Sequence, residues 1–292
     1  MSAQRVAAPR RVAAGTRAGR TAPFSDAPVY FIAIALGAVV LVPIAYVVLS
    51  GFRSTGQLAA KPVGLPHPWV IHNYAKVITS GAFWREIGNS IIVAAIATVL
   101  VVGVSALAAY PLSRMQFRGR EAIYTFFTFG LLFPITVAAL PLYLLLRQLH
   151  LDETLLGVAL PEAAFGIPIT VIILRPFMRA VPTELEDAAA MDGCTSFAFF
   201  WRILLPLTRP ALMTVTILSV ITSWNNFILP LLVLNDAHHW TLPLGAANYS
   251  TEHSVDYAGV LAFTTLSIVP ALIFFLFAER RIVGGLSGAV KG

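Results

Sequence analysis

Long stretches without charged residues constrain the fold of this chain more than any other feature of its sequence. Of its 292 residues, 58% are hydrophobic and 12% are charged, whereas a soluble domain carries about 25% charged residues. Five charge-free stretches are each longer than the roughly 20 apolar residues that a helix needs to span a bilayer. They lie between Asp26 and Arg53, Glu86 and Arg114, Glu121 and Arg147, Arg209 and Asp236, and Asp256 and Glu279.

A sixth apolar segment, at about Leu155 to Phe177, is interrupted only by Glu162 and Arg175. Pro161, Gly166 and Pro168 within it predict a kinked helix. The apolar runs are continuous, not alternating, which excludes a membrane β-barrel. The predicted fold class is therefore an all-α membrane protein, with six transmembrane helices in residues 29–279 and a cytoplasmic loop between spans four and five.

Basic residues orient the predicted helices. Six spans place both termini on one side of the membrane, and a cytoplasmic N-terminus then puts most of the 20 Lys and Arg residues in the cytoplasm, as the positive-inside rule requires. These residues are Arg5, Arg10, Arg11, Arg17, Arg20, Arg114, Arg118, Arg120, Arg175, Arg179, Arg202, Arg209, Arg280, Arg281 and Lys291. The net charge of +6 follows from this topology. No stripe of basic and aromatic residues accompanies it, which argues against nucleic-acid binding.

Both ends of the chain are expected to be cytoplasmic tails. Residues 1–28 are rich in Arg, Ala and Gly, and we interpret them as a disordered tail. The alternatives are a transit peptide or a twin-arginine signal at Arg10-Arg11. The apolar run that follows is too long for a cleaved signal core, which favours the tail. Residues 280–292 are expected to form the C-terminal tail.

The segment between the fourth and fifth predicted spans is acidic and far longer than the roughly 2–8 residues that usually join packed helices. Thr183 stands three residues before Glu186, which predicts a capping box. Acidic residues in a first helical turn suit the helix dipole, and the alanines at 188–190 favour helix. A short helix is therefore predicted from about Thr183 onward.

A bend and a second short helix should follow. Gly193 can take the left-handed conformation that ends a helix. Thr195 or Ser196 can cap the next helix, which Pro206 would end or kink. The simplest alternative for the whole segment is a well-capped linker in water.

Few residues suggest catalysis or metal binding. The six histidines all fall on the predicted outer side, at spacings that match no metal-ligand motif. No Walker-type phosphate loop occurs, so if ATP drives this protein another chain must bind it. The one cysteine, Cys194, excludes an intramolecular disulfide. We predict no catalytic residue, no metal and no cofactor on this chain.

Polar residues at membrane depth are the candidates for a substrate path. Trp224, Asn225 and Asn226 lie near the middle of the fifth predicted span, and Glu162 lies in the outer third of the fourth. Polar groups are costly in hydrocarbon unless they face a cavity or a neighbouring helix. Indole and amide groups suit hydroxyl-rich rings. The alternatives are interhelical hydrogen bonds for the amides and contact with the membrane interface for Glu162.

The acidic loop resembles a known motif. It reads Asp187-Ala188-Ala189, three residues, Gly193, nine residues, and then Ile203-Leu204-Leu205-Pro206. This pattern resembles the EAA loop of binding-protein-dependent ABC importer permeases, except that Asp187 stands where the family usually has Glu and Glu186 precedes it. The resemblance implies that the loop is a coupling helix that docks into a cytoplasmic ATPase. The residues expected to make this contact are Glu186, Asp187, Ala188, Ala189, Gly193, Ile203 and Pro206.

Three further segments resemble carbohydrate-class permeases, in particular the smaller permease subunit of maltose-type importers. They are Ser223–Phe227 with Pro230–Leu232, Thr241–Gly245, and Gly285–Gly292. The likeness extends from about Val29 to Gly292. It implies that the loop Asn235–Tyr257 meets an extracytoplasmic sugar-binding protein. It also implies that the C-terminal tail reaches the ATPase through Gly285, Leu286, Ser287 and Gly288.

The implied function is that of one of two permease subunits of a sugar importer in a bacterial plasma (inner) membrane. The other partners would be a second permease, an ATPase dimer that holds ATP and Mg²⁺, and the binding protein. An importer of the same architecture for a polyol, a glycerol phosphate or an amino sugar is the alternative. An integral membrane enzyme would need clustered titratable residues in the spans, and an ion-coupled transporter would need paired intramembrane charges. Neither pattern is evident.

Overall fold

The computed structural model describes residues 27–250 and 255–289, with side chains described for 28–250 and 255–277. The described secondary structure is helical, apart from one isolated bridge between Ser250 and Val255. The predicted N-terminal tail lies outside the described residues up to position 26. In chain order the helices are α1 (Ala27–Gly51), α2 (Thr55–Ala60), α3 (His72–Thr79), α4 (Gly81–Arg114), α5 (Arg120–Gly130), α6 (Ile135–Gln148), α7 (Leu155–Ala180), α8 (Thr183–Met191), α9 (Ser196–Phe199), the π-helix η1 (Phe200–Leu204), α10 (Leu205–Leu207), α11 (Arg209–Trp224), α12 (Ile228–Val233), α13 (Leu242–Gly245), the 3₁₀-helix η2 (Ala246–Tyr249) and α14 (Tyr257–Ala289).

The chain divides into two units, with the boundary inside α1 between Tyr46 and Val47. In the first unit, α1 is an apolar helix whose large side chains are exposed, among them Val29, Phe31 and Leu41. Its 24-residue apolar stretch is long enough to cross a membrane.

Four of the described helices are long and apolar enough to cross a membrane, and the number rises to six if each of two bent helix pairs counts as one span. The single helices are α1, α4, α7 and α14. The first bent pair is α5 with α6, whose axes differ by 95°. The second is Ser196–Leu207 with α11, at 77°. The all-α membrane fold is thus confirmed, and the count of six spans stays a prediction.

The third expected span is not one straight helix, and its break lies at Pro134. This proline is extended (φ −74°, ψ 129°) and precedes the first residue of α6. Proline has no N–H to donate and disfavours helical geometry at the residue before it. The absence of charge between Glu121 and Arg147 gave no sign of this bend, because hydropathy does not register backbone geometry.

The fifth expected span is also broken, because α11 ends at Trp224 and α12 begins at Ile228. The Asn225 side chain donates to the carbonyl of Ile221 at 2.8 Å, an acceptor that its own backbone N–H also uses. Asparagine side chains compete in this way with helical hydrogen bonds. The predicted polar run therefore lies at the end of a helix, not inside one.

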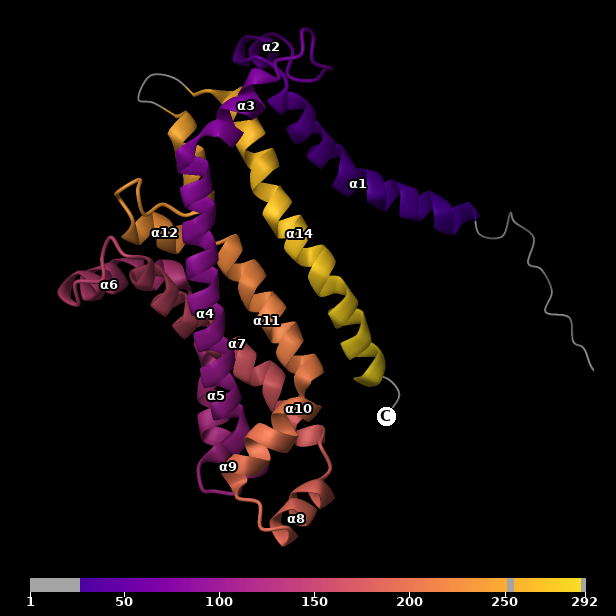
Figure 1. Ribbon diagram of the computed structural model, residues 1–292, viewed down its shortest axis with the longest axis vertical. Helices are drawn as coiled ribbons and strands as arrows, with labels where there is room; N and C mark the ends of the chain where they lie inside the picture. The colour runs from indigo at the N-terminus through magenta and orange to yellow at the C-terminus, as the bar shows by residue number, and fades with distance from the viewer. Residues whose placement is uncertain (1–26, 251–254, 290–292) are drawn as a thin grey trace, which may run out of the picture. The chain divides into compact units, whose positions relative to one another are not determined.

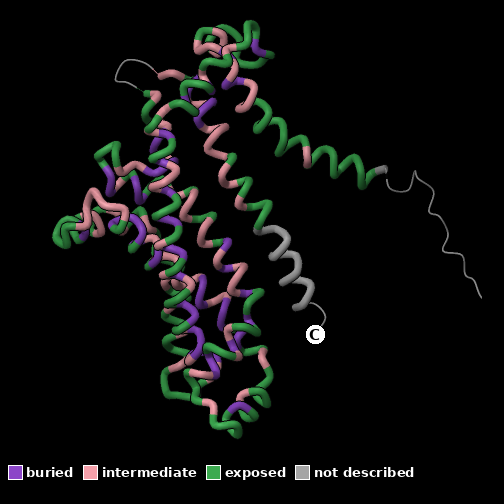
Figure 2. Tube along the Cα trace, in the orientation of Figure 1, coloured by how far each residue is buried: buried purple, intermediate pink, exposed green. Residues whose placement is uncertain are grey.

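In the second unit, α4 and α7 pack along each other, and α11 lies between them and α14 (Figure 1). Buried residues follow α4 and α7 and gather around α9 and η1 (Figure 2). One core cluster joins α4, α7, α9, η1 and α11 near the acidic loop. Two other clusters flank the opposite end of α4, against α7 and α12 on one side and against α3 and α14 on the other.

Candidate functional sites

The first candidate site is the acidic loop, in which α8 begins directly after Pro182. Pro182 is extended (φ −55°, ψ 139°) and makes no side-chain cap. The predicted capping box is wrong, because Thr183 is already the first helical residue. Glu186 does not return to the helix start. Its carboxylate instead accepts a hydrogen bond from Arg114 Nε at 2.9 Å.

The predicted glycine bend is confirmed. Gly193 has φ +75°, a value that L-residues with a side chain rarely adopt. Its N–H donates to the carbonyl of Ala190 at 3.0 Å, and the N–H of Cys194 donates to the carbonyl of Ala189 at 2.9 Å. This pair of bonds is the Schellman arrangement that closes a helix. A Cβ added at Gly193 would meet nothing within 4 Å, so the glycine serves backbone geometry alone.

The second short helix has the predicted cap. Thr195 Oγ1 accepts a hydrogen bond from the N–H of Ala198 at 3.2 Å. The helix then widens into the π-turn η1, in which the N–H of Leu205 reaches the carbonyl of Phe200. Pro206 follows immediately, and the chain bends by 77° into α11. The predicted effect of Pro206 is thus confirmed as a bend at the end of this segment.

Arg114, the last residue of α4, fastens the loop. Its side chain is only 3% exposed. Besides the bond to Glu186, it donates through Nη1 to the carbonyl of Val181 at 2.6 Å. Tyr110, one turn earlier on α4, donates to the carbonyl of Ser196 at 3.1 Å. The two ends of the loop are therefore tied to the same helix. Sequence reasoning used Arg114 only as a basic residue, although its position at the end of a charge-free stretch marked the end of α4.

Packing beneath the loop reinforces these bonds. Phe199 and Phe200 are each 2% exposed and contact the cluster that includes Ala109. Burying a side chain of this size contributes about 1.5–3 kcal/mol. Ala189 is buried in the same cluster, and Ile203 packs against it. These two predicted contact residues thus face the core of this chain, whereas Ala188 and Pro206 are exposed.

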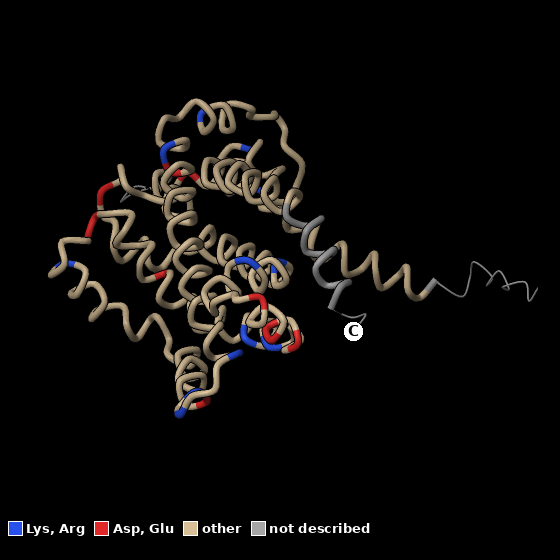
Figure 3. Tube along the Cα trace, turned by 60° about the horizontal axis from the view of Figure 1, so that its bottom comes forward, with Lys and Arg blue, Asp and Glu red and all other residues tan. Residues whose placement is uncertain are grey.

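The outward face of the loop combines apolar and acidic side chains. Met191 is 88% exposed and Phe197 is 69% exposed. Asp187 is exposed as well, and acidic residues gather on the segment around α8 (Figure 3). Sequence reasoning stressed the acids and missed Met191 and Phe197. Their exposure could have been predicted from the sequence, because a large apolar residue beside the bend of a water-exposed loop has few apolar neighbours against which it can be buried.

The second candidate site is a cavity of about 700 Å³ between α7 and α11. Glu162 of α7 lines it and accepts a hydrogen bond from Ser223 Oγ of α11. Asn226 lines it from the break after α11. The cavity is the more polar of the two large ones. Its polar lining residues are Glu162, Thr170, Ser219, Thr222, Ser223, Asn225 and Asn226.

The hydroxyl residues of this cavity were not predicted. Ser219 and Ser223 are four residues apart, which places them on one face of α11, and Asn226 follows in the break after this helix. This polar stripe could have been found by periodicity. The prediction considered only Trp224, Asn225 and Asn226 in this span and therefore missed the two serines.

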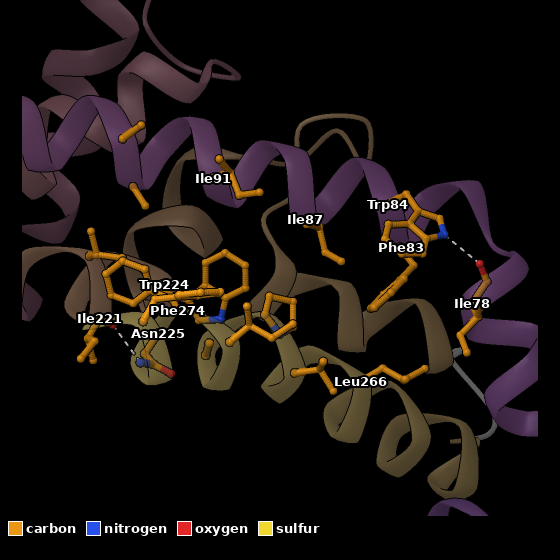
Figure 4. Close-up of a pocket in the computed structure, with 18 residues that line it drawn as sticks. Ile78, Phe83, Trp84, Ile87, Ile91, Ile221, Trp224, Asn225, Leu266 and Phe274 are labelled. Carbon is orange, nitrogen blue, oxygen red and sulfur yellow. Dashed lines mark hydrogen bonds between the residues drawn. The ribbon is translucent and has the colours of Figure 1, made fainter. Parts of the chain in front are cut away.

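Trp224 lies elsewhere. It lines a second cavity of about 780 Å³, between α4, α11 and α14, whose walls are almost entirely apolar. In Figure 4, Trp224 and Phe274 lie close together in this cavity, and Asn225 lies beside them. Asn225 lines both cavities. The structure therefore brings Glu162 and Asn226 together but separates Trp224 from them.

The remaining predicted residues lie at the C-terminus. The backbone of α14 continues to Ala289, so Gly285, Leu286, Ser287 and Gly288 are helical. Their side chains are outside the described set. Among the described residues, no three His, Cys, Asp or Glu side chains are grouped so that they could hold a metal ion.

Comparison with known proteins adds sequence evidence to this geometry. The family described as "Binding-protein-dependent transport system inner membrane component" matches residues 101–283. The diacetylchitobiose uptake system permease protein NgcG of Streptomyces coelicolor is 35% identical, over 85% of this chain and 83% of the relative. The arabinooligosaccharides transport system permease protein AraQ of Halalkalibacterium halodurans is also 35% identical, over 86% of this chain and 91% of the relative.

A solved structure has the same fold. It is that of a bacterial ABC transporter involved in the import of the acidic polysaccharide alginate. The TM-score is 0.74, with 90% of this chain and 99% of that chain covered, at 23% sequence identity. The matched family region, 101–283, contains both the acidic loop and most of the polar cavity.

Proposed function

Because this chain belongs to the family of binding-protein-dependent transport system inner membrane components, we propose that it is a permease subunit of a bacterial ABC sugar importer. The observation that carries the proposal is that one family-matched region holds both the acidic loop, which Arg114 fastens to α4, and a polar cavity between helices. Two relatives are named as permeases for diacetylchitobiose uptake and for arabinooligosaccharide transport, which supports a sugar as the cargo.

The loop around Gly193 is proposed to dock on a partner ATPase, which binds ATP and Mg²⁺, so that this chain needs no cofactor. Exposed Met191 and Phe197 supply an apolar contact, and exposed Asp187 supplies charge. Glu186 has a different role, because Arg114 holds its carboxylate. We therefore assign Asp187 to the partner and Glu186 to the attachment of the loop to α4.

The cavity at Glu162 is proposed to form this subunit's share of the sugar path. Its hydroxyl, amide and carboxylate groups can exchange hydrogen bonds with sugar hydroxyls. Neither Lys nor Arg is among the described residues that line it, which suits a neutral sugar better than an anionic one. Rotation of α11 during the transport cycle would bring Trp224 to the same path beside Asn225, where the indole ring can stack on a sugar and the amide can hydrogen-bond it.

The proposed topology follows from the charge pattern, and the proposed assembly follows from the family to which the chain belongs. Residues 29–279 make six spans, and the tails at 1–28 and 280–292 are cytoplasmic, the second of them reaching the ATPase. The N- and C-termini are thus on the side of the acidic loop, in the bacterial inner membrane. A second permease completes the path, and an extracytoplasmic binding protein delivers the sugar. The ATPase must bind two permease states unequally in order to drive the change between them.

Solute uptake tests this function. A strain that lacks the gene is supplied with labelled oligosaccharides, amino acids, polyols and phosphorylated compounds, with and without a plasmid copy. We expect the plasmid to restore uptake of an oligosaccharide. Restoration of amino-acid uptake alone would refute the sugar assignment, and restoration of no solute would refute the importer.

A further inference from the structure

The segment 235–250, which precedes α14, is held against the end of α4 that is remote from the acidic loop. Leu242 is 1% exposed and joins the core cluster of α3 and α14, whereas Leu244 is 3% exposed and joins the cluster of α7 and α12. Two leucines only two residues apart thus enter different cores. The segment therefore lies across α4 and cannot shift along it without withdrawing one of them.

Three polar side chains of α4 hold this segment by hydrogen bonds, two of them through its backbone. Asn89 Nδ2 donates to the carbonyls of His238 and Trp240, at 3.0 and 2.9 Å. Ser90 Oγ accepts from the N–H of Leu242 at 2.8 Å. These bonds involve backbone atoms of residues 238, 240 and 242, so they fix the path of the backbone independently of which side chains the segment exposes.

The third side chain is Glu86, one turn before Ser90 on the same helix face. It is 1% exposed and accepts a hydrogen bond from Asn248 Nδ2 at 2.6 Å. Its other oxygen, Oε2, has no hydrogen-bond partner among the described residues and lies against Gly245. A Cβ at Gly245 would overlap this oxygen and approach Phe263 Cζ to 2.5 Å. The glycine of the Thr-Leu-Pro-Leu-Gly sequence is thus required by the space that Glu86 fills.

We propose that Glu86, Asn89 and Ser90 are positioning residues that hold residues 235–250 as a preformed docking surface for an extracytoplasmic sugar-binding protein. This inference rests on the proposed function. A preformed loop binds its partner more tightly than a flexible one, because it loses less conformational entropy when the complex forms. The side chains of Asn235, Asp236 and His238 remain exposed and offer polar groups to the partner.

Stimulation of the ATPase by the binding protein tests the proposal. The whole complex is reconstituted in nanodiscs, and the purified binding protein encoded beside this permease is titrated in. Glu86→Gln keeps an acceptor for Asn248 and should behave like the wild type. Glu86→Ala should raise the half-maximal concentration of binding protein about five- to tenfold, the loss expected of about one buried hydrogen bond. Gly245→Ala should raise it as well, because its methyl group would overlap Glu86 and Phe263. ATPase activity without binding protein should not change.

The double variant separates positioning from general damage. Alanine at 86 removes the overlap of a methyl group at 245 with Glu86 and leaves only its contact with Phe263, so Glu86→Ala/Gly245→Ala should need less binding protein than Gly245→Ala alone. Such non-additivity is expected only for residues in contact. Hydrogen exchange gives a second readout, in which Ser90→Ala should speed exchange of the Leu242 amide.

Two results would overturn the inference. One is a half-maximal concentration within twofold of the wild type for both alanine variants. The other is strict additivity in the double variant. If no binding protein stimulates the wild-type complex, the proposed function itself fails, and this inference fails with it. A stimulated wild type with unchanged variants would remove only the positioning role.

Discussion

Replacement of Gly193 is the sharpest test of the acidic loop. The residue sits at φ +75°, and a side chain in the left-handed region costs about 1–2 kcal/mol, more for a β-branched residue. Steric contact adds nothing, because an added Cβ would meet no atom within 4 Å. Gly193→Ala should thus impose only this backbone cost, and Gly193→Val a larger one.

The consequence for transport can be worked out from this cost. A penalty of about 1–2 kcal/mol lowers the population of the bent loop relative to an unbent one by a factor of about 5–30. The apparent affinity for the ATPase should fall by the same factor if only the bent loop docks. This factor applies to Gly193→Ala, and Gly193→Val, whose backbone cost is larger, should abolish transport while the subunit still inserts into the membrane. Gly193→Asn is the matched control, since asparagine tolerates this conformation, and it should keep most activity.

Co-purification of the ATPase with each variant, together with sugar uptake, measures both steps. Membrane levels of the permease are compared by immunoblot, so that loss of insertion is distinguished from loss of docking. Wild-type uptake by the valine variant would show that the loop is only a linker.

Other contacts lead to further predictions. Arg114→Gln should loosen the loop by about 1–3 kcal/mol, because buried acceptors lose their donor, and proteolysis between α7 and α9 should accelerate. Glu162→Leu should lower sugar uptake about fivefold or more without loss of assembly, whereas Glu162→Gln should lie between it and the wild type. Burial alone would raise the pKa of Glu153, but hydrogen bonds from Asp236 and Asn235 outweigh it and hold the pKa below its usual value. The ionised carboxylate therefore stabilises the folded state fully above about pH 4.3, and this stabilisation is lost as the pH falls through the depressed pKa. Glu153→Gln should accordingly make the melting temperature depend less on pH in the acid range. Reporter fusions after Lys61 should report an outside location and fusions after Glu184 an inside one, and an outside signal at Glu184 would refute both the topology and the docking role.

Sequence reasoning succeeded where local chemistry alone decides the structure. Gly193 and Thr195 adopt the predicted bend and cap because each depends on its immediate neighbours. The capping box at Thr183 failed because Glu186 found a stronger partner, Arg114, 72 positions away. No local pattern announces such a partner, and tertiary ion pairs override capping preferences whose worth is about 1 kcal/mol.

The same contrast holds for the membrane region. Apolar runs located α4 and α7 well, since each is a single helix that matches its charge-free or nearly charge-free stretch. They missed the breaks at Pro134 and at Asn225, because mean hydropathy is insensitive to a missing N–H or to a competing amide. The sequence also did not indicate that Trp224 and Glu162 line different cavities. That placement depends on where α11 ends and on the helices against which α11 packs.

The unbroken length of α4 has a consequence for insertions and deletions. At 1.5 Å per residue its 34 residues extend roughly 51 Å, with Glu86 facing one loop near its start and Arg114 facing another at its end. One residue inserted near Val104 would turn these two ends by about 100° relative to each other. Either residues 235–250 or the acidic loop would then lose its hydrogen bonds to α4, although every original side chain remains present. Seven inserted residues complete almost two full turns and restore the angular phase. The number of residues between Glu86 and Arg114, which sets the angle between their side chains about the axis of α4, is therefore constrained as well as the identity of those residues.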